Sequence, residues 1–321
     1  MTMNPAPKEI GFTTVRIQTQ DGYALGGRMF DQAGDACLII LGATGVPQYY
    51  YQSFAQFFAS RGVSVLTFDY RGVGESIPAG GPAAVKGGMT HWMRLDSKAA
   101  LDVVLEKWAG RRIWAIGHSI GGQAMGLVKS LDKAERAIMV ASQLPYWRDY
   151  HWNRLPLVWL ASHVLMPGLS RLLGYFPGSR LGLGEDLPKE VAMDWGRWLR
   201  SRNYLFDYLS SEDRKSYDTF AVPILAYKLM DDILAQGEMV EKLLRFYPSA
   251  RPLIRTVAPE EFGVAGIGHL GVFRSRFREN LWNEMFNWFS EGVKPGTARP
   301  LTEILLSRKN GKRSNHMNGE T

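Results

Sequence analysis

A serine flanked two residues away by glycines lies between a short apolar run and a helix-like stretch. The residues are Gly117, Ser119 and Gly121, with the apolar run at 112–116 and the helix-like stretch at 123–128. A tight turn from a strand into a helix exposes a serine hydroxyl, and the helix start offers free backbone N–H groups to a charged oxygen. Glycines are expected there because the backbone comes too close to tolerate a Cβ. The pattern therefore predicts a serine that attacks carbonyl carbons.

This motif needs support from the rest of the chain, because short glycine patterns recur by chance among 34 glycines in 321 residues. The alternative is that Ser119 simply caps the N-terminus of a helix. A nucleophilic serine also requires a base and a carboxylate that orients the base. Two adjacent aspartates, Asp231 and Asp232, follow an apolar run, and His269 lies in a glycine-rich loop nearer the C-terminus.

The elements that must position these residues alternate along the chain. Two strands flank the turn residues Asp21 and Gly22, which predicts an antiparallel hairpin of 15–19 and 25–30. Continuous apolar runs then alternate with helix-length stretches, which is typical of a parallel sheet covered on both faces. The predicted strands are 37–41, 63–68, 113–116, 137–141, 224–227 and 253–257. The predicted helices are 51–60, 96–108, 120–131, 238–246 and 276–289.

The alternation stops between residues 146 and 217, where no strand pattern is visible. Five of the ten tryptophans fall in this segment, which we interpret as an inserted helical cap. The apolar run 155–167 is too short for a membrane span and contains His163 and two prolines, so we expect an apolar cap helix. The predicted division is therefore 10–145 and 218–292 for the two parts of the sheet core, 146–217 for the cap, and 293–321 for a polar, basic, solvated C-terminal tail.

Composition favours a globular chain, with 45% hydrophobic and 21% charged residues. Much of the net charge of +7 falls in the C-terminal tail, and no stripe of basic and aromatic residues appears, so nucleic-acid binding is not expected. The single cysteine, Cys37, excludes an intrachain disulfide and lies in an apolar run, which predicts a buried thiol. Residues 1–7 lack a basic start and an apolar run, so we expect a cytoplasmic location.

No metal and no organic cofactor is expected. The sequence has neither a cluster of metal-ligating residues at suitable spacing nor a dinucleotide-binding glycine loop. The predicted chemistry therefore depends on the chain's own side chains.

The chain resembles the α/β-hydrolase family from about residue 17 to residue 289, with the cap covered only loosely. Besides the serine turn, residues 69–76 match the family's D-x-R-G-x-G-x-S stretch. We expect Asp69, Arg71 and Ser76 to shape the turn after their strand. The resemblance implies a mostly parallel, doubly wound sheet with an inserted helical cap. Among named subgroups the chain looks most like lysophospholipase-like and serine-aminopeptidase-like hydrolases.

The resemblance also implies a role for each candidate residue. Ser119 would be the nucleophile and His269 the general base and then the general acid. The family's spacing favours Asp232 over Asp231 as the carboxylate partner of the histidine. His118, next to the nucleophile, is expected to pack or to form hydrogen bonds rather than to transfer protons.

An oxyanion hole is implied in the same way. It would combine the backbone N–H of Ile120 with one from the loop of Gly42, Ala43 and Thr44, and Thr44 is our choice of second donor. Most relatives carry His-Gly in this loop, whereas this chain has Gly42-Ala43.

The implied activity is hydrolysis of an ester or a related acyl bond through an acyl-enzyme. The aromatic and aliphatic cap favours a hydrophobic small molecule as the substrate. Acyl transfer or thioester cleavage by the same three residues is one alternative. The other is a protein of this fold that binds a small molecule without turning it over.

Overall fold

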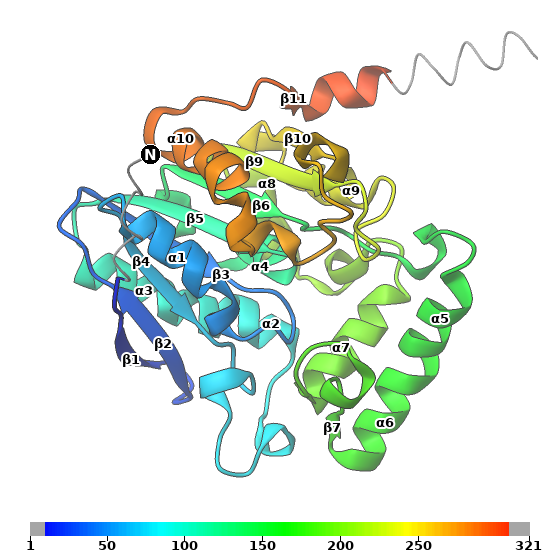
Figure 1. Cartoon of the computed structure of the whole chain (residues 1–321). Coiled ribbons are helices and arrows are strands. Elements are labelled where there is room, and N and C mark those ends of the chain that lie inside the picture. Colours follow the sequence, from blue (N-terminus) through cyan, green and yellow to red (C-terminus); the bar gives the residue numbers. More distant parts are fainter. Residues whose placement is uncertain (1–9, 308–321) are drawn as a thin grey trace, which may run out of the picture.

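The computed structural model describes residues 10–307, and its centre is a nine-stranded sheet with helices on both faces (Figure 1). The strand order is β1-β2-β4-β3-β5-β6-β9-β10-β11, and all pairs from β4 to β10 are parallel. The strands are β1 Thr13–Gln18, β2 Ala24–Phe30, β3 Ala36–Leu41, β4 Ser64–Phe68, β5 Arg112–His118, β6 Arg136–Val140, β9 Ile224–Leu229, β10 Leu253–Val257 and β11 Arg299–Pro300.

The predicted strands are confirmed, each within two residues at either end. The antiparallel hairpin of β1 and β2 is present, and every residue of β3 and β4 is buried. Continuous apolar runs form these strands because helices cover both faces of the sheet. Cys37 lies in β3 as a buried free thiol, as expected.

The helices follow the predicted positions, with two clear differences in length. The predicted helix 276–289 is α-helical only from Asn283, after a π-helical turn Arg278–Trp282. The core helices are α1 Gln52–Ala59, α3 Ser97–Lys107, α4 Ile120–Ala124, α9 Met239–Leu244 and α10 Asn283–Glu291. The prediction of a helix over 120–131 is wrong beyond Ala124. A Cβ on Gly126 would lie 2.4 Å from the ring of Tyr217, and the Tyr217 hydroxyl donates to the carbonyl of Gln123 at 2.7 Å. Tertiary contacts therefore end this helix early.

Most of the segment between β6 and β9 forms a group of helices beside the sheet, lower right in Figure 1, whereas its last helix lies against the core. Its helices are α5 Leu155–Leu160, α6 Met166–Leu173, α7 Lys189–Leu199 and α8 Ser211–Thr219, with a π-helical turn Ala161–Leu165 joining the first two. The expectation of no strand here is wrong, because β7 Tyr175–Phe176 pairs with β8 Leu187–Pro188. Strands of two residues are too short to show any alternation in the sequence.

The C-terminal segment is more ordered than predicted. β11 pairs antiparallel with β10, and residues 301–307 are helical with Leu301 buried. Residues 299–307 thus have regular structure, which was not predicted, although most of their side chains are exposed to solvent. The basic residues at 308–313 and the N-terminal residues 1–9, on which other predictions rest, lie outside the described residues. Within the described part, no helix is long and apolar enough to span a membrane.

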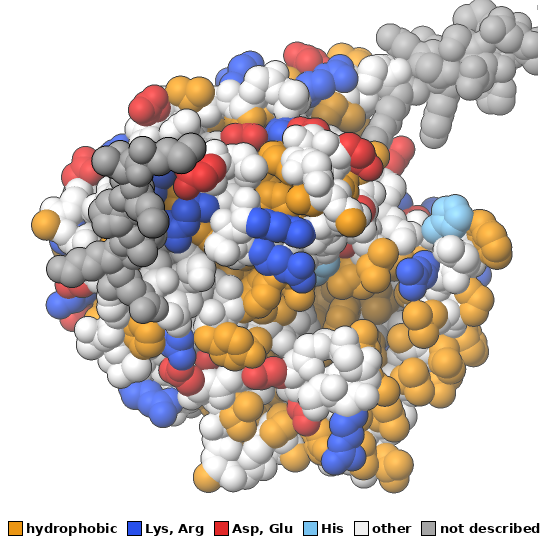
Figure 2. Space-filling model, in the orientation of Figure 1, with side chains coloured by type: hydrophobic (Ala, Val, Ile, Leu, Met, Phe, Trp, Pro, Cys, Tyr) orange, Lys and Arg blue, Asp and Glu red, His pale blue; other side chains and the backbone are white. Residues whose placement is uncertain are grey.

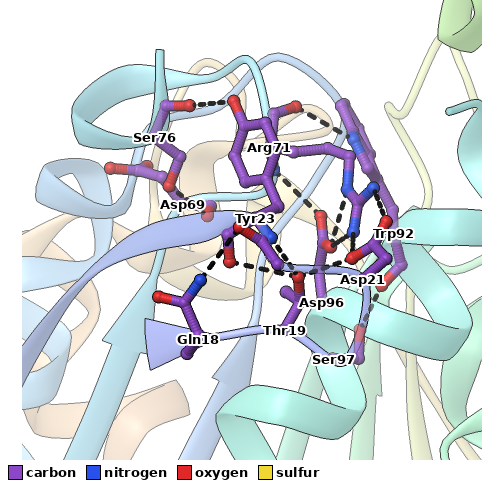
Figure 3. Close-up of polar contacts among 11 residues, drawn as sticks. Gln18, Thr19, Asp21, Tyr23, Asp69, Arg71, Ser76, Trp92, Asp96 and Ser97 are labelled. Carbon is purple, nitrogen blue, oxygen red and sulfur yellow. Dashed lines mark hydrogen bonds and ion pairs between the residues drawn. The ribbon is translucent and has the colours of Figure 1, made fainter. Parts of the chain in front are cut away.

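The stretch after β4 has the structural role that we expected. Figure 3 shows the Arg71 guanidinium between the carboxylates of Asp21, at 2.7 Å, and Asp96, at 2.6 Å. The Arg71 and Asp96 side chains are almost fully buried, and Arg71 holds the pKa of Asp21 down at about 2. Trp92 Nε1 donates to the Arg71 carbonyl at 3.1 Å. This ion-pair cluster ties β4 to the β1–β2 turn and to the start of α3.

Asp69 and Ser76 hold the same turn through backbone contacts. Asp69 accepts the backbone N–H of Gln48 at 2.6 Å and that of Glu75 at 2.9 Å. The Ser76 hydroxyl donates to the Asp69 carbonyl at 2.7 Å and accepts the N–H of Gly26. Burial raises the pKa of Asp69 to about 6.

Candidate active site

Ser119 occupies a strained turn between β5 and α4. Its φ is 53° and its ψ is −114°, a backbone conformation that residues other than glycine rarely adopt. The Ser119 N–H donates to the carbonyl of Val140 in the neighbouring strand at 2.9 Å. The serine thus stands where the sequence placed it, at the carboxyl end of a central strand and at a helix start.

The two flanking glycines are needed for close backbone approach, as predicted. A Cβ on Gly117 would lie 2.4 Å from the backbone nitrogen of Gly122. A Cβ on Gly121 would lie 2.1 Å from the carbonyl oxygen of Leu41 at the end of β3. This second contact brings the start of α4 against the loop that follows β3, so Ile120 lies next to the predicted oxyanion loop.

In this loop Ala43 and Thr44 differ in what their backbone N–H groups contact. The N–H of Ala43 donates to the Tyr51 hydroxyl oxygen at 2.9 Å. Within residues 10–307, the N–H groups of Thr44 and Ile120 donate to no acceptor. Within that range the N–H groups of Thr44 and Ile120 are therefore free, whereas that of Ala43 is engaged.

Asp232 and His269 form a hydrogen-bonded pair. Asp232 Oδ2 lies 2.7 Å from His269 Nδ1, and the Asp232 side chain is fully buried. Asp232 Oδ1 accepts the backbone N–H groups of Leu234 at 2.8 Å and Ala235 at 3.1 Å. With its carboxylate fixed from both sides, Asp232 orients the imidazole so that Nε2 is the nitrogen left for proton transfer.

The neighbouring aspartate has a different contact. Asp231 Oδ2 accepts the backbone N–H groups of Ile267 at 2.7 Å and Gly268 at 2.9 Å. It therefore holds the loop that carries His269. The family's spacing favoured Asp232 as the partner of the histidine, as observed, but nothing in the sequence predicted that Asp231 would hold the histidine loop.

His118 connects the oxyanion loop with the histidine loop. Its Nδ1 lies 2.9 Å from the Tyr51 hydroxyl, and its Nε2 lies 2.9 Å from the carbonyl oxygen of His269. Burial lowers the pKa of His118 well below its usual value, so the ring is neutral. A carbonyl only accepts, so Nε2 carries the proton and Nδ1 accepts from Tyr51. His118 thus forms hydrogen bonds, as expected, while Tyr51 was missed by the sequence analysis.

The imidazole of His269 lies beside His118, the residue that precedes Ser119, and among the described residues it forms no hydrogen bond with the serine. The rings of His118 and His269 have centroids 5.2 Å apart, which places His269 beside the residue that precedes Ser119. Among the hydrogen bonds of residues 10–307, none joins Ser119 Oγ to His269. Catalytic hydrogen bonds are often long before a substrate binds.

The described part of the chain has a surface cleft of about 930 Å³ between α3 and α8 and a hollow of about 520 Å³ lined in part by Asp231 and Asp232. Neither of them is lined by Ser119 or His269. Within residues 10–307, no cluster of three or more histidine, cysteine or acidic side chains is placed to hold a metal ion.

Comparison with known sequences decides the family. Residues 38–277, three quarters of the chain, match the profile of the alpha/beta hydrolase family. The chain belongs to this family. The nine-stranded, mostly parallel sheet is the fold of this family. The resemblance inferred from the serine turn and from residues 69–76 is therefore confirmed. No curated protein matches the chain in sequence.

Solved structures with the same fold include esterases and monoglyceride lipases. A soluble variant of the Saccharomyces cerevisiae monoglyceride lipase, in complex with a substrate analog, has a TM-score of 0.62 at 16% identity, covering 91% of this chain and 100% of that one. The Exiguobacterium antarcticum esterase has a TM-score of 0.58 at 14% identity, covering 87% and 100%. The Pyrococcus furiosus esterase Pf2001 has a TM-score of 0.54 at 16% identity, covering 90% and 98%. Identities this low show a shared fold alone.

Proposed function

We propose that this hydrolase-family protein is a serine hydrolase that cleaves an ester or a related acyl bond of a hydrophobic small molecule. The observation that carries the proposal is the Asp232–His269 hydrogen bond, at 2.7 Å, beside the strained turn of Ser119. A serine becomes nucleophilic when an imidazole, oriented by a carboxylate, can take the proton of its hydroxyl group.

In the first half of the reaction, Ser119 Oγ attacks the carbonyl carbon while its proton passes to His269 Nε2. The N–H groups of Ile120 and Thr44 hold the negative oxygen of the tetrahedral intermediate. The intermediate expels the alcohol, which takes the proton from His269 and leaves an acyl group on Ser119. Asp232 stabilises the imidazolium that exists between these two steps.

In the second half, water attacks the acyl carbon and gives its proton to His269. The intermediate then collapses, Ser119 recovers the proton, and the carboxylic acid leaves. Every proton that His269 accepts is returned within the same half-reaction, so the cycle needs no cofactor. The esterase and lipase neighbours support ester hydrolysis as the reaction class.

A fluorophosphonate probe tests the proposal, because it phosphonylates an activated serine without needing the natural substrate. We expect the wild-type protein to be labelled and Ser119→Ala to remain unlabelled. Ser142→Ala is the matched control, because Ser142 is also buried beside the turn but hydrogen-bonds the carbonyl of Gly117. Labelling that persists in Ser119→Ala, or no labelling of a folded wild-type protein, contradicts the proposal, and the second result favours a protein that binds without turnover.

A series of p-nitrophenyl esters with increasing acyl length then tests the substrate class. Activity is expected to rise from acetate to a medium chain, since the residues near the cap are aromatic and aliphatic. Equal activity on all chain lengths contradicts a hydrophobic acyl site.

A further inference from the structure

The continuous helical segment from α5 to α6 carries apolar side chains on its outer face. The exposed fraction is 56% for Leu157, 39% for Leu160, 46% for Val164 and 80% for Leu172. Their spacing of three, four and eight residues places them along one side of the helix. A helix that faces water normally presents charged residues at such positions.

The inner face of the same segment is buried against the rest of the protein through both apolar and small polar side chains. Ser162 and Ser170 are completely buried there, and Met166 is nearly so. A Cβ on Gly196 of α7 would lie 3.1 Å from the Ser162 carbonyl oxygen, so the two helices approach closely through small residues. Met166, Leu165 and Leu169 also pack inward against the core, and the outer leucines and Val164 take no part in that packing.

The charges around this strip have one sign. Residues 150–184 contain no aspartate or glutamate, and their three arginines, Arg154, Arg171 and Arg180, are exposed. Trp152 and Trp159 are 74% and 44% exposed. Figure 2 shows hydrophobic side chains gathered over α5 and α6, on the right of the view. Leucine, tryptophan and arginine without acidic residues form the composition of helices that lie in the plane of a lipid surface.

We propose that this outer face, formed by Leu157, Leu160, Val164 and Leu172, docks on an anionic lipid surface. In a symmetric pair of chains the same arginines would face each other, which opposes association, whereas lipid phosphates neutralise them. The apolar strip would enter the boundary between headgroups and acyl chains, and the arginines would contact the headgroups. The inference goes beyond the proposed function and does not require Ser119 to be catalytic.

Vesicle co-sedimentation tests the docking, with vesicles of phosphatidylcholine alone and of phosphatidylcholine mixed with phosphatidylglycerol. The full-length protein is expected to bind the mixed vesicles and to bind the neutral ones far less. Leu157→Gln/Leu172→Gln removes apolar area without changing charge, and we expect its partition to fall at least about tenfold. Arg154→Gln/Arg171→Gln is expected to lose about thirtyfold, at about fivefold for each cation near the surface.

Val293→Gln/Leu306→Gln is the matched control, because these side chains are 51% and 60% exposed but lie outside the cap. It is expected to bind vesicles like the wild type. Equal loss in the control and the cap variants overturns the proposal. So does a concentration-dependent dimer that Leu157→Gln/Leu172→Gln dissociates, or wild-type protein that stays in the supernatant with both vesicles.

The Ser119→Ala protein separates this test from that of the proposed function. It is expected to bind mixed vesicles as well as the wild type. Absence of fluorophosphonate labelling would therefore remove the catalytic proposal while leaving vesicle binding intact, and absence of vesicle binding would leave labelling intact.

Discussion

Replacing each of the two adjacent aspartates by asparagine tests the assignment of the triad carboxylate. In Asp232→Asn, the amide oxygen keeps the backbone N–H groups of Leu234 and Ala235, and the amide NH2 then faces His269 Nδ1. A donor at this place forces the tautomer with the proton on Nε2, which cannot accept the serine proton. The expected loss in kcat is about 10³- to 10⁴-fold, or about 4–5.5 kcal/mol of barrier.

Asp231→Asn keeps the same size and the same change in charge, which makes it the matched comparison. Its amide oxygen can still accept the N–H groups of Ile267 and Gly268, so the histidine loop keeps both hydrogen bonds in weakened form. Bonds to a charged acceptor contribute about 1.5–3 kcal/mol and neutral ones about 1 kcal/mol. We therefore expect a stability loss of about 1–3 kcal/mol and at most about a tenfold loss of activity.

The assay is hydrolysis of a p-nitrophenyl ester at saturating substrate, with urea unfolding of the same samples. Ser119→Ala provides the background rate. The assignment is refuted if a folded Asp232→Asn retains near wild-type kcat, or if Asp231→Asn loses the larger factor while its unfolding midpoint is unchanged.

Three further changes address the fold around the site. In Gly121→Ala the new Cβ would lie 2.1 Å from the Leu41 carbonyl oxygen, so the free energy of unfolding is expected to fall by about 1–3 kcal/mol or more in urea unfolding. Gly168→Ala, where the Cβ would meet open space, is the control and is expected to cause no loss of stability. Arg71→Met leaves the buried Asp96 carboxylate without its cation and is expected to cost about 3–5 kcal/mol in the same measurement, and an unchanged midpoint contradicts this. The pKa of His118 is lowered in the folded state, so the free energy of unfolding of the wild type should fall relative to that of His118→Gln by about 1.4 kcal/mol per pH unit below about 6.5. Parallel stability curves of the two proteins would refute this.

The sign of the His118 effect follows from proton binding. Below about pH 6.5 the unfolded chain protonates this histidine and the folded chain does not, so acid favours unfolding. Asp69, with its pKa raised to about 6, acts in the opposite direction because the folded state binds the extra proton. Asp69 is present in both proteins, so the difference between them isolates His118.

The strand pattern and the serine turn could be predicted because their causes are local. Buried parallel strands are continuous apolar runs, and Gly117 is required by a close contact with Gly122 in the same turn. Gly121 belongs to the same local pattern, although its close contact is with the distant carbonyl of Leu41. The premature end of α4 could not be predicted, because it depends on Tyr217, nearly a hundred residues away. The two-residue strands β7 and β8 could not be predicted for a different reason: they are too short to show any pattern in the sequence.

The division of work between the two aspartates shows why the site was only partly predictable. Order along the chain restricts the carboxylate to Asp231 or Asp232, but their side chains diverge only because consecutive residues at a strand end point in different directions. Asp232 meets the imidazole, and Asp231 meets the backbone of the loop beneath it. The family's spacing favours Asp232, but only the folded backbone shows what each of the two carboxylates contacts.

The neutral His118 ring explains how three loops from distant parts of the chain are kept in register before any substrate binds. The Ala43 N–H donates to the Tyr51 hydroxyl, this hydroxyl donates to His118 Nδ1, and His118 Nε2–H donates to the carbonyl of His269. The relay uses the N–H of Ala43, which leaves that of Thr44 for a substrate, and it fixes the backbone rather than the side chain of His269. A protonated His118 could not accept from Tyr51, so the same burial that keeps the ring neutral keeps the oxyanion loop and the histidine loop joined.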